Sequence, residues 1–113
     1  IRVYRVDSAV ACGLVVNPQP AEAQIQGGVN FGLSSALFHA ITVRGGAVEN
    51  RNFPDFNMVR LAQAPRVNVS FLDSDGPVGG LGEPGVPPVA PAVANARFVL
   101  TGTRLRDLPL RLT

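Results

Sequence analysis

Lysine is missing from this 113-residue chain, and cysteine and histidine each occur only once. All ten cationic side chains are therefore arginines, and they are scattered, whereas a nucleic-acid binder gathers its cations into a patch or stripe. The single cysteine, Cys12, excludes an internal disulfide, and it cannot build a zinc or iron–sulphur site without partners from elsewhere. We therefore expect no nucleic-acid partner, and we expect Cys12 to be a small buried residue.

Long apolar runs are also missing. No run approaches the ~18 residues that would suggest a membrane span, and no secretory signal pattern is visible. The chain does contain 46% apolar and only 16% charged residues, which is enough to build a core in one small domain. Because residues 1–10 already read as a strand in progress, we interpret residues 1–113 as a single domain, or part of one, from a longer polypeptide.

Hydrophobic spacing predicts an α+β fragment with short strands and two main helices. The expected elements are strands at 1–10 and 66–72, a helix at 21–38, two short strands around Gly45-Gly46, an irregular segment at 55–64, a glycine loop at 73–85, and a helix after Pro87-Pro88 that ends at Gly102. The buried face of the second helix is expected to carry Val89, Val93, Ala96 and Leu100.

The first helix should bury Ile25, Val29, Leu33 and Leu37, which lie four residues apart. Its interior also contains three glycines, each of which costs about 1 kcal/mol relative to alanine. One ridge of this helix carries Ala21, Gln24, Gly28, Gly32 and Ser35. Such a ridge permits close approach either of another backbone or of a ligand, and the sequence leaves both possibilities open.

The glycine loop formally matches the GxGxxG dinucleotide pattern at Gly80 to Gly85. Three features argue against that function. The pattern does not directly follow the strand, the prolines around it have no N–H to donate to a phosphate, and Glu83 would place a carboxylate beside the anion. The loop is better suited to presenting Glu83 itself, since its glycines allow close backbone approach and Pro84 stiffens the next position.

Two interpretations of Glu83 remain open on the residues alone. The carboxylate could accept a proton near neutrality, favoured by the dipole of the following helix, or it could be an ordinary surface glutamate on a turn. The single histidine, His39, has no acid or thiol neighbour at catalytic spacing. We expect His39 to be an ordinary strand or loop residue.

Several segments together resemble one protein family. The segments are CGLVVNP, AQIQGGVNFGLSSAL, NFPDF, GGLGEPGVPPVAPAVANA and TGTRLRDLPL, between about Val10 and Leu110. They are similar to the C-terminal end of the molybdopterin-binding large subunit of the xanthine dehydrogenase and aldehyde oxidase family of molybdenum hydroxylases. Within it, they look most like the beta subunits of bacterial isoquinoline 1-oxidoreductases and their aldehyde-oxidising relatives.

The resemblance implies roles for individual residues. Glu83 matches the glutamate of the family's GEP motif, which stands beside the molybdenum as general base, and Gln24 matches a glutamine that hydrogen-bonds the pyranopterin. Gly28 and Gly82 complete the expected cofactor-binding set, and none of these residues is expected to be a metal ligand. Two departures are visible. Ala11 stands where many relatives have aspartate, and Phe56 stands where they often have tyrosine.

By the same resemblance, the intact enzyme would oxidise a carbon of an N-heterocycle or aldehyde with oxygen from water. It would use a molybdopterin-type molybdenum cofactor, the remainder of the large subunit, and iron–sulphur clusters on a partner subunit. The fragment alone should be inactive. Two alternatives stay open, a nucleotide-binding module and a non-catalytic structural or interaction domain, and the compartment could be the bacterial cytoplasm or periplasm.

Overall fold

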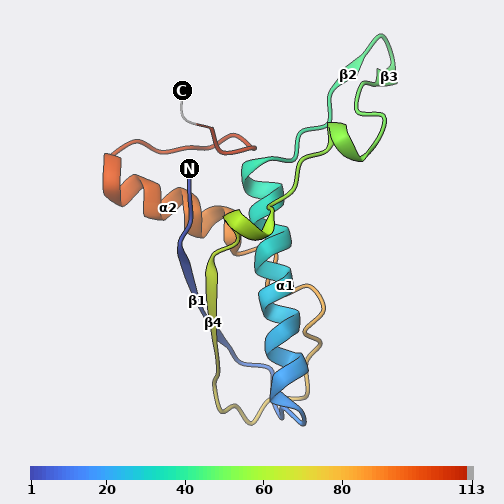
Figure 1. Cartoon of the computed structure of the whole chain (residues 1–113). Coiled ribbons are helices and arrows are strands. Elements are labelled where there is room, and N and C mark those ends of the chain that lie inside the picture. The colour runs from blue at the N-terminus through green and yellow to red at the C-terminus, as the bar shows by residue number, and fades with distance from the viewer. Residues whose placement is uncertain (112–113) are drawn as a thin grey trace.

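Two parallel strands lie beside a long helix, and a second helix crosses near one end of the pair (Figure 1). The computed structural model describes residues 1–111. Its elements are β1 (Arg5–Val10), α1 (Pro18–Leu37), β2 (Val43–Arg44), β3 (Ala47–Val48), β4 (Arg66–Phe71) and α2 (Val89–Thr101), with 3-10 turns at Phe53–Asp55 and Leu61–Gln63. The predicted α+β class, with short strands and two main helices, is confirmed.

β1 and β4 form a parallel pair in which Arg5 lies opposite Arg66 and Val10 lies opposite Phe71. On the solvent face of this pair, the Asn68 amide donates to the Asp7 carboxylate at 2.7 Å, and Arg5 donates to the same carboxylate at 2.7 Å. These bonds favour the charged form, so they lower the pKa of Asp7 below its ordinary value of 3.8. A polar cross-strand cluster thus covers the outward face of the sheet.

The apolar face predicted for α1 is confirmed. Ile25, Val29 and Leu33 are at most 2% exposed, and Leu37 at the end of the helix is half-buried. The helix begins at Pro18, three residues before the expected start, because proline is tolerated in a first helical turn where its missing N–H has no partner to lose. The core consists of this face together with Ala36, Val89, Val93 and Leu110.

The interior glycines of α1 allow the chain's own backbone to approach closely. A Cβ atom on Gly28 would lie 3.1 Å from the Cα of Gly85, and one on Gly32 would lie 2.8 Å from the carbonyl oxygen of Val86. Of the two possibilities left open for the small-residue ridge, backbone packing therefore holds at Gly28 and Gly32. The segment 85–89 lies in the space that larger side chains would fill, and its packing offsets the helical cost of the two glycines.

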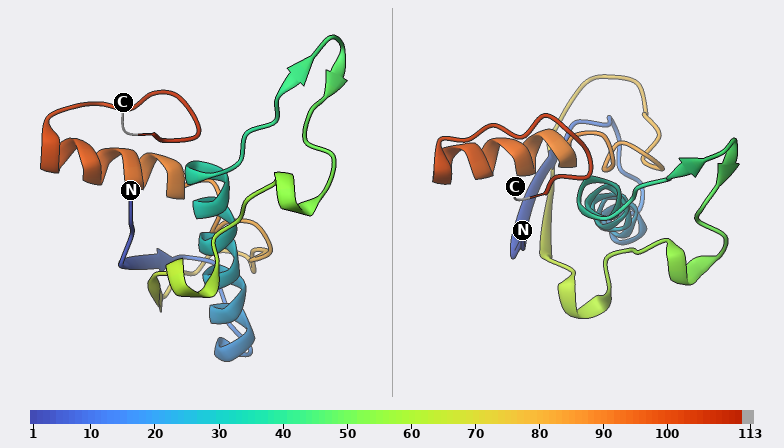
Figure 2. Two further views of the ribbon diagram at one scale, coloured as in Figure 1. Left: turned by 45° about the horizontal axis from the view of Figure 1, so that its top comes forward. Right: turned by 90° about the horizontal axis from the view of Figure 1, so that it is seen from above.

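Only half of the face predicted for α2 is buried. Val89 and Val93 belong to the core, but Ala96 is exposed and Leu100 is 84% exposed, so the prediction was wrong for these two residues. The reason is geometric, since the first half of α2 packs on α1 while its second half extends outward past β1 (Figures 1 and 2). Gly102 ends the helix in the left-handed region at φ 69°, as predicted.

The predicted hairpin forms an arm that projects from the body (Figure 2). Gly45 and Gly46 have φ angles of 57° and 80°, which suit the tight turn between β2 and β3. The segment 55–64 is irregular as expected, apart from its 3-10 turns. The first strand is shorter than predicted, because ladder pairing with β4 begins at Arg5 and leaves residues 1–4 outside the strand.

The chain exposes more surface than a compact protein of its mass. Its accessible surface is 8116 Å², whereas a compact monomer of 11.9 kDa would expose about 6,000 Å². The radius of gyration is 16.2 Å, compared with about 13 Å for a compact domain of this length. Large apolar side chains such as Leu61 and Val99 are 94% and 82% exposed. The core is therefore small for the amount of apolar surface the chain carries.

Gly32→Ala should destabilise the fold. The new methyl group would lie 2.8 Å from both the Val86 carbonyl oxygen and a Val89 methyl carbon, so we expect the free energy of unfolding to fall by about 1–3 kcal/mol despite the better helix propensity of alanine. Gly27→Ala is the matched control, because nothing lies within 4 Å of its added methyl. Urea unfolding of both variants measures the difference, and equal stability of the two would contradict the packing argument.

Candidate functional site

A groove of about 460 Å³ lies between one side of α1 and the loop that precedes α2. Its lining residues are Gln24, Gly27, Gly28, Phe31, Gly82, Glu83, Val86 and Pro87. All four residues singled out in the sequence, Gln24, Gly28, Gly82 and Glu83, therefore lie on one groove. The fold brings them together from two segments that are far apart in the chain.

Helix α1 supplies one wall. Gln24, Gly27, Gly28 and Phe31 follow the i, i+3, i+4, i+7 pattern, which places them on the same side of a helix. Gln24 is exposed, so its amide is free to donate to and accept from a bound group. A Cβ atom on Gly27 would meet nothing within 4 Å, so this part of the helix backbone is open to close approach.

Two successive turns shape the opposite wall. The N–H of Val86 donates to the carbonyl oxygen of Glu83 at 2.8 Å, and the N–H of Val89 donates to the carbonyl oxygen of Val86 at 3.3 Å. Between them, Gly85 lies so close to α1 that a Cβ atom there would sit 2.9 Å from the carbonyl oxygen of Ile25. This contact fixes the loop against the helix and holds Glu83, two residues earlier, on the groove.

Glu83 is the only charged residue among those of residues 1–111 that line the groove. It is exposed, and its carboxylate makes no hydrogen bond or ion pair with another side chain in the described part of the chain. The carboxylate oxygens are therefore available to accept protons from a molecule in the groove.

The geometry of the glycine loop disfavours an anion-binding role. β4 ends at Phe71, so residues 72–79 separate the strand from Gly80, where the GxGxxG pattern begins. At the start of α2, Pro88 and Pro91 have no N–H, and the N–H of Val89 already donates to Val86. Few amides remain to cradle a phosphate.

Three aromatic rings contact one another in sequence, starting from Phe31 on the helical wall of the groove. The ring of Phe31 meets that of His39 edge-on at 5.9 Å, and the His39 ring stacks on Phe56 at 4.1 Å. Ser35 lies 3.1 Å from Nδ1 of His39. His39 is the loop residue that the sequence predicted, but its place in this stack was not anticipated.

Phe31, Val86 and Pro87 were also missed as lining residues, because only the fold puts them on the groove.

The side chains of the described residues limit which ligands the groove could hold. Within residues 1–111, no group of three or more His, Cys, Asp or Glu side chains is placed to hold a metal ion. The described residues therefore do not form a protein metal site by themselves, and the remaining question is whether the groove suits a group that carries its own metal ligands. The groove fits such a group, because its volume lies within the usual range of ligand sites, the backbone is bare at Gly27 and Gly82, and Gln24 and Glu83 supply an amide and a carboxylate.

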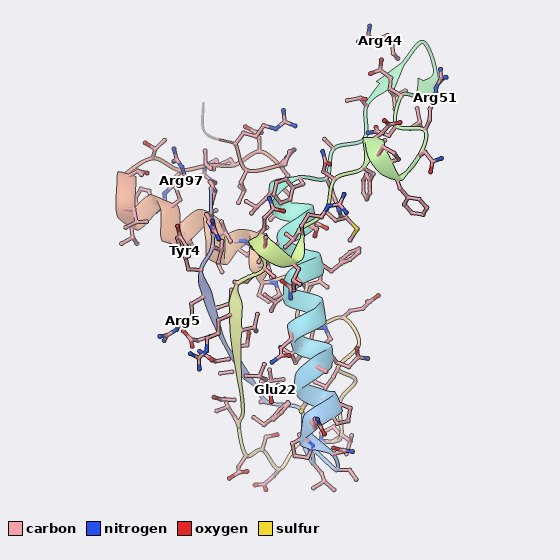
Figure 3. The ribbon with its side chains drawn as sticks, viewed as in Figure 1. Tyr4, Arg5, Glu22, Arg44, Arg51 and Arg97 are labelled. Carbon is pink, nitrogen blue, oxygen red and sulfur yellow. The ribbon has the colours of Figure 1, made fainter. Side chains whose placement is uncertain are left out.

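The other charged groups lie outside the groove. Figure 3 shows Arg44 and Arg51 on the projecting arm, Arg97 on α2 and Arg5 on β1, so these arginines are spread over separate parts of the molecule. Neither helix in the described part of the chain is long and apolar enough to cross a membrane.

Comparison with known proteins decides the family. The sequence profile of the molybdopterin cofactor-binding domain matches residues 1–65, which is more than half of the chain and includes Gln24 and Gly28. The chain belongs to this molybdopterin cofactor-binding family. The resemblance recognised from the sequence motifs is thereby confirmed.

Relatives of this cofactor-binding domain are much longer proteins. The chain is 38% identical to the beta subunit of isoquinoline 1-oxidoreductase from Brevundimonas diminuta over 98% of its own length, but it spans only 14% of that protein. It is 40% identical over 90% of its length to a membrane-bound aldehyde dehydrogenase of Gluconacetobacter polyoxogenes, whose name specifies pyrroloquinoline quinone, and spans 13% of it.

The fold of the domain also recurs in a solved structure. The crystal structure of quinoline 2-oxidoreductase from Pseudomonas putida 86 matches 96% of this chain with a TM-score of 0.85 and 20% sequence identity, and the match covers 15% of that chain. At this identity the likeness establishes the fold alone. The arrangement of two helices and short strands is thus shared with a segment of a much larger protein.

The stability of the domain should fall as the pH drops through 6.5. Desolvation by burial lowers the pKa of His39 below its ordinary value of 6.5, so below that pH the unfolded chain takes up a proton more readily than the folded one. The contribution of the neutral His39 side chain to the free energy of unfolding is complete above pH 6.5. It is lost as the pH falls through the pKa that His39 has in the folded state. His39→Phe retains an aromatic ring but should lose this pH dependence.

The measurement is the melting temperature at pH 7.5 and 5.5 for both proteins. A drop in the wild type that His39→Phe reduces is the expected result. An equal drop in both would show that another group titrates.

Proposed function

We propose that the chain is part of the large subunit of a molybdenum hydroxylase, and that the groove between α1 and the Gly82–Pro87 loop is one wall of its cofactor site. The observation that carries this proposal is that Gln24, Gly28, Gly82 and Glu83 all line the same groove. Membership of the molybdopterin cofactor-binding family supports the choice of cofactor.

Glu83 acts as the general base in this proposal. A carboxylate oxygen of Glu83 takes a proton from a water molecule that becomes the oxygen source for the substrate, and general bases typically contribute 10²–10⁴-fold to rate. Gln24 orients the cofactor through hydrogen bonds from its side-chain amide, and the bare backbone at Gly27 and Gly82 allows close approach. Gly28 contributes mainly by letting the loop pack on the helix. The bound cofactor supplies the redox centre that takes up the substrate's electrons.

The substrate would be an electron-poor carbon of an N-heterocycle or an aldehyde. The printed names of the two sequence relatives, an isoquinoline oxidoreductase and an aldehyde dehydrogenase, support these two classes. The partners would be the remainder of the large subunit and an iron–sulphur subunit that carries the electrons away. Because residues 1–111 supply only two walls of the groove, the chain by itself should not turn over substrate.

The Gluconacetobacter relative raises a second cofactor, since its name specifies pyrroloquinoline quinone. The family match favours molybdopterin, because it is to a molybdopterin cofactor-binding domain.

A nucleotide ligand is disfavoured by the prolines at the start of α2, and nucleotide titration tests it directly. Metal and quinone analysis of the purified full-length subunit separates the two redox cofactors, and a subunit containing neither would favour a purely structural domain.

Glu83→Gln in the complete enzyme should abolish most turnover. The amide keeps the size of the side chain but cannot accept the proton, so we expect kcat to fall by about 10²–10⁴-fold while molybdenum content stays at the wild-type level. Steady-state kinetics and metal analysis of the same preparation measure both quantities.

Glu49→Gln is the matched control. Glu49 lies at the base of the β2–β3 arm, where it pairs with Arg44 at 2.9 Å. Because it is outside the groove, replacing its carboxylate should leave kcat and molybdenum content unchanged. Turnover near the wild-type rate in Glu83→Gln would end the assignment of Glu83 as the base. A parallel loss of molybdenum in that variant would assign Glu83 to cofactor retention instead.

A further inference from the structure

The outer edge of β1 has unpaired backbone groups. In a parallel ladder, alternate residues of a strand direct both their N–H and C=O groups to the same neighbour. Here the carbonyl oxygens of Tyr4 and Val10 accept from Arg66 and Leu72 of the β4 side, so the even-numbered residues of β1 face β4. Arg5, Asp7 and Ala9 therefore direct their backbone groups to the opposite side, where no strand lies within residues 1–111.

The other edge of this two-stranded sheet is covered. Helix α1 runs alongside β4, and the side-chain amide of Gln26 approaches the outward carbonyl oxygen of Val67 at 3.5 Å. Within the described part of the chain, no corresponding element covers the outer edge of β1. Figure 3 shows Arg5 pointing away from α1 on the open side of the strand. The sheet is thus closed at β4 and open at β1.

Two apolar hollows lie along the open edge. The first, of about 370 Å³, extends along residues 6–11, which include most of β1, and is backed by Ile25, Val29 and Val89 of the core. The second, of about 510 Å³, lies between the start of β1 and the exposed side of α2, including Ala96 and Leu100. Val6, Asp7 and Ala92 line both hollows, so together they form one continuous trough. The second half of α2 lines the second hollow and extends beyond β1 (Figure 2).

We propose that an extended segment of the remaining large-subunit polypeptide adds to the outer edge of β1 as a third strand. This inference rests on the proposed function, in which residues 1–113 are part of a larger subunit. The segment would pair with the N–H and C=O groups of Arg5, Asp7 and Ala9. Its inward side chains would be apolar and fill the trough under α2, and its outward side chains would be polar and lie beside the Arg5–Asp7 ion pair.

Several observations favour this occupant. Parallel strands occur almost only in sheets buried on both faces, so a solvated parallel pair with an open edge is unusual. The chain exposes about 2,000 Å² more surface than a compact protein of its mass, and the exposed apolar residues of α2 are part of that excess. The matched segments make up only 14% and 13% of the two sequence relatives, so ample chain exists to supply a strand.

Hydrogen exchange in the full-length subunit, resolved to single amides, tests the proposal. We expect the amides of Arg5, Asp7 and Ala9 to exchange at least about tenfold more slowly than in an unstructured peptide, because each would donate to the added strand. The amides of Val6, Ser8 and Val10 donate toward β4 and serve as internal controls that should be protected in any case. Molybdenum content is measured on the same sample.

Rapid exchange at Arg5, Asp7 and Ala9 beside protected controls would overturn the proposal. Protection of these three amides that is lost on dilution would also overturn it, since a second copy of the protein would then be the partner. The molybdenum measurement keeps the two claims separate. Protection in a subunit without molybdenum would support strand addition and reject the proposed function, whereas rapid exchange in a molybdenum-loaded subunit would reject strand addition alone.

Discussion

The backbone of Gly85 lies against the backbone of α1 at Gly28, and the candidate site depends on this contact. A Cβ atom added at Gly28 would lie 3.1 Å from its nearest heavy atom, and a Cβ atom added at Gly85 would lie 2.9 Å from its nearest heavy atom. Neither position could therefore carry a side chain without moving its neighbours. Because the two glycines meet, the loop before α2 reaches the helix, Val89 enters the core and Glu83 stands on the same groove as Gln24. The same loop therefore places Val89 in the core and Glu83 on the groove.

The site and the sheet are both open on one side. The groove has a single carboxylate, an exposed amide and bare backbone, but no set of side chains that could bind a metal within residues 1–111. The sheet has one covered and one uncovered edge, and half of α2 lies over an apolar trough. In the proposed function, both open features have the same explanation: further polypeptide would complete the sheet, and an organic cofactor would occupy the groove.

Local patterns predicted much of the fold. The four-residue spacing from Ile25 to Leu33 identified the buried face of α1, and Gly102 and Gly45-Gly46 marked a helix end and a hairpin, because these signals act over a few residues. Burial of Ala96 and Leu100 was predicted wrongly, since apolar spacing identifies a face but not whether a partner covers it. The parallel pairing of β1 with β4, the Phe31–His39–Phe56 stack and the Gly28–Gly85 contact join distant segments, and single-chain periodicity carries no information about them. The convergence of Gln24 and Glu83 on one groove followed from family resemblance rather than from residue spacing.

An experimental structure of the full-length subunit with its cofactor tests the central claim most directly. The account predicts that the cofactor occupies the groove between residues 24–31 and 82–87, with the Gln24 amide within hydrogen-bond distance of it and the Glu83 carboxylate facing the metal. A structure in which other polypeptide fills this groove and the metal lies away from Glu83 would contradict it.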